Sequence, residues 1–133
     1  MSATIDREAF RAQVREFVRE ALPVEVREKV RLGVELNKSD MLAWEGRLRD
    51  RGWLVPHWPL EWGGTGWDPA QQALFKDELV LNHAPEIGGI TLDMIGPILI
   101  RYGNEAQKRY FLPKILSLEH FWCQGYSEPN AGS

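Results

Sequence analysis

The sequence predicts an all-α domain that ends in the first strand of a separate β domain. Two observations predict this fold class. Apolar residues recur at helical spacing in most segments before residue 117, and Asp, Asn, Pro and Gly stand where helices begin and end. The last segment instead alternates like a strand, over HFWCQGY at residues 120–126.

The first predicted helix covers residues 6–22. Thr4 or Asp6 can cap its start, and Pro23 ends it. Residues 24–37 are charged and weakly periodic, so we interpret them as a loose helix or a linker. The first helix has arginines and glutamates on its outer faces and one apolar stripe, formed by Phe10, Val14, Phe17, Val18, Ala21 and Leu22.

A second helix is predicted over residues 40–51, with Ser39 as its N-cap and Gly52 as the left-handed residue after its end. Residues 53–69 hold three prolines, three glycines and four tryptophans, which excludes a long regular element. Asp68 and Pro69 then form a strong helix start. The helix that follows offers three leucines for burial, Leu74, Leu79 and Leu81.

A fourth helix is predicted to start at Ile87 or Thr91 and to run to Tyr102, where Gly103 closes it. Because this segment is apolar on most sides, we expect it near the middle of a helical bundle.

The last predicted helix opens at Asn104, which pairs with Gln107 in a pattern typical of a capping box. Pro113 lies inside the helical pattern and should kink the helix or restart it at Leu112. After Ser117 the pattern changes from helical spacing to alternation.

Residues 120–126 would place Phe121 and Cys123 on one face of a strand, with Trp122, Gln124 and Tyr126 on the other. A single strand satisfies none of its ladder hydrogen bonds, and the sequence offers it no partner. We therefore expect residues 1–118 to form a helical domain and residues 119–133 to begin a truncated β domain.

Composition narrows the function classes. The chain has 133 residues, 44% of them hydrophobic, which predicts one globular unit. Its net charge of −3 gives it no excess of positive charge with which to bind nucleic acid. Residues 53–100 carry one lysine against six acidic residues, which is typical of a solvated face. A single cysteine, Cys123, and the absence of a signal peptide or a membrane-spanning apolar run predict a cytoplasmic protein.

Three features suggest chemistry but have simpler interpretations. The loop EWGGTGWDP could cradle a phosphate, yet it lacks the lysine of a P-loop, and a tight turn that packs tryptophans is favoured. Asp77 and Glu78 are adjacent on a helix and point about a hundred degrees apart, so we interpret them as surface charge. No metal site is predicted, because no ligand spacing relates the three histidines, His57, His83 and His120.

The terminal stretch YSEPNAGS gathers short polar side chains at the end of the predicted strand. Ser127, Asn130 and Ser133 can each donate and accept hydrogen bonds, and Gly132 lets a ligand approach the backbone closely. Such a turn suits a heteroaromatic edge or a pyrophosphate. By spacing alone, an ordinary Pro/Asn/Gly turn explains it equally well.

Three stretches in order resemble the amino-terminal half of the acyl-CoA dehydrogenase family: WLVPHWPLEWGGTGW, IGPILIRYGNEAQKRYFLPKIL and WCQGYSEPNAGS. The resemblance covers most of the chain and weakens before Ser39. It implies an amino-terminal helical domain, a middle β-barrel domain and a carboxy-terminal helical bundle with FAD between them. This chain would supply the first domain and the first strand of the second.

The resemblance also implies site residues. Gln124, Tyr126 and Ser127 fall where the family binds the flavin, with Ser127 in place of the commoner threonine. Gly132 and Ser133 fall beside the FAD phosphates, and Ser133 also where the family touches the acyl-CoA substrate. Asn130 replaces the usual glycine, and Asn tolerates the left-handed backbone that the turn needs. Trp122 and Tyr126 would shape the cleft.

In the family, a glutamate takes the α-proton of the acyl-CoA and the β-hydrogen leaves as hydride to the flavin, which gives the trans-2-enoyl thioester. That base lies in the carboxy-terminal bundle, so we expect this chain alone to carry no catalytic residue and to be inactive. The resemblance further implies an electron-transfer-flavoprotein-type acceptor and a homo-oligomeric parent. Two alternatives stay open: an acyl-CoA oxidase or other flavoprotein of the same fold, and a non-catalytic helical subunit that completes a partner's active site.

Overall fold

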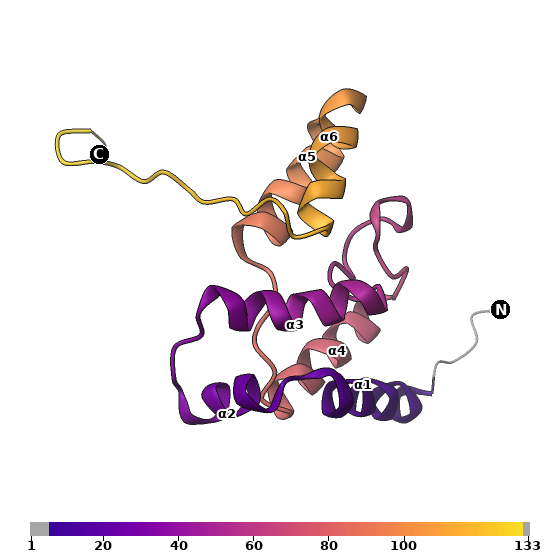
Figure 1. Cartoon of the computed structure of the whole chain (residues 1–133). Helices are drawn as coiled ribbons and strands as arrows, with labels where there is room; N and C mark the ends of the chain where they lie inside the picture. The colour runs from indigo at the N-terminus through magenta and orange to yellow at the C-terminus, as the bar shows by residue number, and fades with distance from the viewer. Residues whose placement is uncertain (1–5, 132–133) are drawn as a thin grey trace. The chain divides into compact units, whose positions relative to one another are not determined.

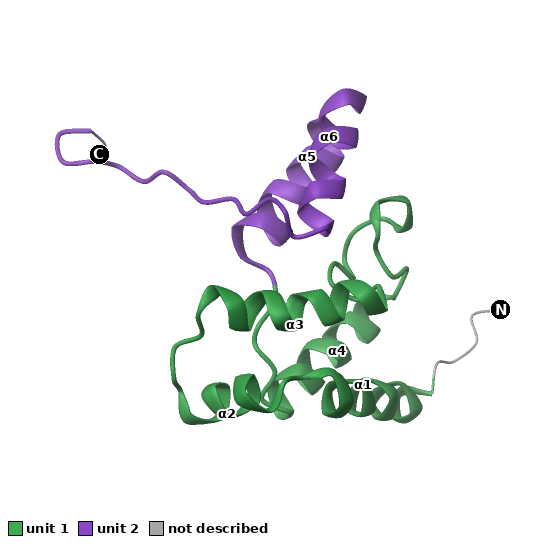
Figure 2. Cartoon of the chain, viewed as in Figure 1, with its two compact units in different colours: residues 1–87 green, residues 88–133 purple. Residues whose placement is uncertain are grey.

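The computed structural model describes residues 6–131, and all of their regular elements are helices, so the all-α fold class is confirmed (Figure 1). The chain divides into two compact units, Met1–Ile87 and Gly88–Ser133 (Figure 2). This division does not coincide with the predicted domain boundary after residue 118, which stays a prediction.

The first unit begins with two helices, α1 (Arg7–Ala21) and α2 (Val24–Leu32). Asp6 caps α1, because its carboxylate accepts hydrogen bonds from the Glu8 and Ala9 N–H groups, both at 3.1 Å. The apolar stripe of α1 is buried at Phe10, Val14, Val18 and Leu22. The ambiguous segment after Pro23 is therefore largely a helix, which Gly33 ends in the left-handed conformation.

Helix α3 (Lys38–Arg51) starts earlier than predicted, so the assignment of Ser39 as N-cap was wrong. Asn37 is the cap: its Oδ1 accepts from the Asp40 N–H at 2.9 Å, and Asp40 Oδ2 accepts from the Asn37 N–H at 3.0 Å. This reciprocal pair satisfies two backbone donors, whereas Ser39 only donates its hydroxyl to Asn37. Gly52 ends α3 at φ 78°, as expected.

After an irregular loop that contains the short 3-10 helix η1 (Leu60–Trp62), helix α4 (Pro69–Leu81) packs against α1. Asp68 caps α4 as predicted, in a capping box with Gln71. Of the leucines expected to be buried, Leu79 is buried, but Leu81 is 66% exposed. The face that α4 turns to the core instead includes Phe75 and, unexpectedly, Glu78.

The second unit contains a π-helix η2 (Ile90–Ile95), α5 (Gly96–Tyr102) and α6 (Glu105–Leu116). The fourth helix is therefore present as predicted, but its first part is a π-helix. Its expected place at the middle of a bundle stays a prediction: Met94, Ile98 and Tyr102 are 47%, 51% and 74% exposed. Within the second unit, helix α5 packs on η2 and α6.

Asn104 and Gln107 form the predicted capping box at the start of α6, with both bonds at 2.9 Å. The helix continues through Pro113 to Leu116 and does not restart at Leu112. The described residues form no β-ladder at residues 120–126, and the strand expected there, which needs a partner from another domain, stays a prediction. Alternating side chains alone do not make a strand when no second strand pairs with its backbone.

Candidate functional site

A tight turn at Glu128–Ala131 lies at the centre of the candidate site. The Ala131 N–H donates to the Glu128 carbonyl at 2.9 Å. Pro129 is the first of the two central residues, and its ring fixes its own φ angle. The second central residue, Asn130, adopts φ 82°, the left-handed value that a type II turn requires at this position. The prediction that asparagine would preserve the turn is therefore confirmed.

The segment before the turn carries the other predicted contacts. Gln124, Tyr126 and Ser127 are exposed, and none of their side chains forms a hydrogen bond to another described residue. They offer an amide, a phenol and a hydroxyl to a ligand. Gly132 and Ser133, the remaining predicted contacts, lie outside the described residues.

Trp122, which we expect to shape the cleft, is held against the helices of the second unit. Its ring packs edge-on against Phe111 of α6, with centroids 5.4 Å apart, and its backbone N–H donates to Thr91 Oγ1 at 3.0 Å. Strand parity grouped Trp122 with Gln124 and Tyr126, but only Trp122 is half-buried. Sequence reasoning missed Thr91, because a lone threonine near the start of an apolar segment gives no signal of a contact 31 residues away.

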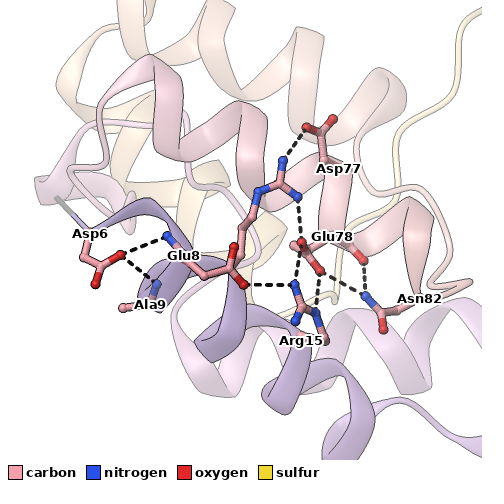
Figure 3. Close-up of polar contacts among 8 residues, drawn as sticks. Asp6, Glu8, Ala9, Arg15, Asp77, Glu78 and Asn82 are labelled. Atoms are coloured by element: carbon pink, nitrogen blue, oxygen red, sulfur yellow. Dashed lines mark hydrogen bonds and ion pairs between the residues drawn. The ribbon is translucent and has the colours of Figure 1, made fainter.

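The interpretation of Asp77 and Glu78 as surface charge holds for Asp77 and was wrong for Glu78, which is 1% exposed (Figure 3). Glu78 accepts from Arg11 at 2.7 Å, from Arg15 at 3.2 Å and from the Asn82 amide at 3.3 Å. The missed signal is the i, i+4 spacing of the two arginines, which places both on one face of α1.

Burial raises the pKa of Glu78, but the hydrogen bonds and charges of Arg15 and Arg11 outweigh burial, and the net shift is downward. The carboxylate therefore stays ionised at neutral pH. An ionised and fully paired carboxylate stabilises the α1–α4 contact and is unsuited to taking or giving a proton in a reaction.

The glycine-rich loop before α4 packs tryptophan side chains, which is the interpretation that the sequence favoured over a phosphate cradle. Trp67 lies among three aromatic rings, Phe10, Trp53 and Phe75, with centroid distances of 5.1–5.3 Å. A Cβ on Gly64 would lie 1.5 Å from the Trp58 carbonyl oxygen, so only glycine fits this crossing of the backbone.

Residues 6–131 contain neither a membrane-spanning helix nor a cluster of metal ligands. None of their helices combines the length and the apolar character that a membrane crossing needs. They also bring no three His, Cys, Asp or Glu side chains together at a spacing suited to a metal ion.

Known proteins resemble this chain over most of its length. Residues 4–119 match the family model described as acyl-CoA dehydrogenase, N-terminal domain. Over 97% of its length the chain is 37% identical to acyl-CoA dehydrogenase IpdE1 of Mycolicibacterium smegmatis, of which it covers 34%.

Two solved structures are also similar to this chain. The chain is similar to one in the crystal structure of the ChsE4–ChsE5 complex from Mycobacterium tuberculosis, with a TM-score of 0.74 and 31% identity, over 99% of this chain and 33% of that one. It is also similar to a variant of the Tcur3481–Tcur3483 steroid ACAD, with a TM-score of 0.75, 33% identity and coverages of 95% and 33%. The chain thus spans about a third of the length of these relatives. It belongs to the acyl-CoA dehydrogenase family and carries that family's N-terminal domain.

Proposed function

We propose that the chain forms the amino-terminal part of an FAD-dependent acyl-CoA dehydrogenase, which oxidises an acyl-CoA thioester to the trans-2-enoyl-CoA. The observation that carries the proposal is the turn at Glu128–Ala131. It forms with Asn130 in the left-handed conformation, at the end of a domain that belongs to this family. A hydroxyl, an amide and a phenol precede the turn and have no hydrogen-bond partner among the described residues.

These donors suit the FAD that the family implies. Ser127 would donate its hydroxyl or its backbone N–H to the polar edge of the flavin ring, beside Gln124 and Tyr126. Gly132 and Ser133 would meet the FAD phosphates, and Ser133 also the acyl-CoA. When bound, FAD supplies the hydride acceptor of the reaction. Because the chain spans a third of its relatives, the base that takes the α-proton would lie in the remaining two thirds, and this chain alone would be inactive.

A steroid-derived CoA thioester is the substrate class to test first. One structural relative is named a steroid ACAD variant, and it is 33% identical to this chain over 95% of this chain and 33% of its own length. We propose that the parent works in the cytoplasm and passes electrons to an electron-transfer-flavoprotein-type acceptor.

The decisive experiment adds acyl-CoA thioesters to the FAD-loaded full-length protein under anaerobic conditions. We expect a steroid-derived thioester to bleach the visible absorbance of the flavin and to yield the enoyl product. If every thioester fails to reduce the flavin, the proposed function is wrong. Rapid peroxide formation in air, with no need for an acceptor protein, would favour the acyl-CoA oxidase alternative.

A separate observation favours assembly with a non-identical partner chain. Both structural relatives are named as pairs of different proteins, ChsE4 with ChsE5 and Tcur3481 with Tcur3483. This chain could accordingly belong to a subunit that completes the active site of a non-identical partner, instead of a homo-oligomer. Expressing the full-length protein alone and together with a second, non-identical acyl-CoA dehydrogenase chain separates the two arrangements. Flavin binding that requires the second chain supports the mixed assembly.

A further inference from the structure

Trp122 is the last anchored residue before the exposed segment that carries the candidate flavin contacts. Its backbone N–H donates to Thr91 Oγ1 at 3.0 Å, and its ring packs on Phe111 with an interplanar angle of 68°. Cys123, the next residue, is exposed, and Tyr126 is 77% exposed. The chain therefore passes from a fixed point to an exposed segment within one residue.

The end of α6 directs the chain to this point. Leu118 adopts the left-handed conformation at φ 64°, and the N–H groups of Glu119 and His120 both donate to the Lys114 carbonyl at 3.1 Å. The His120 ring lies 6.2 Å from that of Phe111. These contacts turn the chain back along α6, so that Trp122 arrives over Phe111.

Thr91 is itself held in place. It is 8% exposed in the first turn of η2, and the start of that helix is fixed by the Gly89 N–H, which donates to Asp93 Oδ2 at 3.0 Å. The indole Nε1 of Trp122 is buried and meets no acceptor among the described residues, so the ring makes no directional polar contact of its own. Among described partners, the bond to Thr91 is the hydrogen bond that ties residues 121–127 to another element.

We propose that Thr91 is a positioning residue for the flavin site, acting through the Trp122 backbone. The proposal rests on the proposed function, because it assumes that Ser127 contacts FAD. Ser127 lies five positions after Trp122, and an extended chain of that length spans at most about 18 Å. The Thr91 bond thus shortens the unanchored stretch of chain that carries Ser127, and loss of the bond would raise the ordering cost of flavin binding.

The test compares three variants of the full-length protein. Thr91→Val keeps the β-branched shape and removes the acceptor, whereas Thr91→Ser keeps the hydroxyl. Thr65→Val is the matched control, because Thr65 Oγ1 likewise accepts a tryptophan backbone N–H, that of Trp67, at 3.3 Å in the first unit. Amide hydrogen exchange at Trp122 reports the anchor without flavin, and a titration with FAD reports the site.

We expect Thr91→Val to speed Trp122 exchange and to weaken FAD binding, each by about tenfold, the loss that one hydrogen bond produces. Thr91→Ser should restore both to within about twofold, and Thr65→Val should change neither. Unchanged Trp122 exchange in Thr91→Val would disprove the anchor. Faster exchange with unchanged FAD affinity, or an equal effect of Thr65→Val, would disprove the positioning role. If the wild-type protein binds no FAD, the proposed function fails, and Trp122 exchange still decides whether the anchor exists.

Discussion

Gly64 illustrates how one side chain can be excluded by a backbone crossing. An added Cβ would lie 1.5 Å from the Trp58 carbonyl oxygen and 2.4 Å from its carbon, and neither backbone atom can rotate away. We predict that Gly64→Ala destabilises the protein by about 3 kcal/mol or more, because the tryptophan loop must open. Chemical denaturation of the wild type and of Gly64→Ala measures the loss in free energy of unfolding.

Gly46 is the control for that prediction, because a Cβ there meets only the end of Arg49 at 3.9 Å, and the residue lies inside α3. Gly46→Ala should therefore stabilise the protein by about 0.5–1 kcal/mol. If both substitutions had the same effect, the close crossing at Gly64 would not be what excludes a side chain.

Glu78 predicts a pH dependence of stability. Its pKa is lowered from the ordinary value of 4.5, so the folded state holds the proton more weakly than the unfolded state. The stabilisation is present above pH 4.5 and is lost as the pH falls through the lower pKa of the folded state. We expect Glu78→Gln to cost about 1–3 kcal/mol at pH 7 and much less near pH 3.

Denaturation of the wild type and of Glu78→Gln across this range measures the difference between them. Asp77→Asn serves as the control, because Asp77 is exposed and 3.4 Å from Arg11, so its loss should change stability little at any pH. A difference for Glu78→Gln that stays constant from pH 7 to pH 3 would contradict the assignment.

At the scale of the helix, α4 ends in a way that the sequence did not signal. The Ala84 N–H donates to the Leu79 carbonyl at 2.9 Å and the His83 N–H to the Val80 carbonyl at 3.1 Å, the pattern of a Schellman motif. His83 occupies the left-handed position at φ 56°, where glycine is usual. We predict that His83→Gly stabilises the protein by about 0.5–1 kcal/mol and that His83→Ala does not.

Thermal unfolding of the two variants checks this prediction. A gain in His83→Ala equal to that in His83→Gly would show that removal of the imidazole matters and that relief of the left-handed strain does not.

The helices show which structural features local sequence encodes. Asp68 with Pro69, and Asn104 with Gln107, predicted two helix starts, because each signal lies within four residues. At α3 two candidates lay two residues apart, and only the reciprocal bond to Asp40 favours Asn37 over Ser39. Burial of Glu78 and the bond between Thr91 and Trp122 depend on partners 31 or more residues away, which no local pattern specifies.

For the whole molecule, the turn of the candidate site was predictable and its anchoring was not. The turn chemistry of Pro129 and Asn130 is local, whereas the strand expected before it needs a partner that the described residues do not provide. Met94, Ile98 and Tyr102 recur every fourth residue and are exposed on η2 and α5. Both features agree with a chain that spans a third of its relatives, whose remaining parts would pair the segment and cover the apolar side chains.

Ser127→Ala in the full-length protein is the sharpest check on our proposal that residues 124–133 supply one half of a flavin site. The variant and the wild type are titrated with FAD, and their flavin spectra and turnover are compared. We predict about five- to tenfold weaker FAD binding and a shifted flavin spectrum, because one hydrogen bond to the ring is lost. Ser127→Thr, which keeps the hydroxyl, should bind like the wild type. Unchanged flavin affinity, spectrum and turnover in Ser127→Ala would contradict the account.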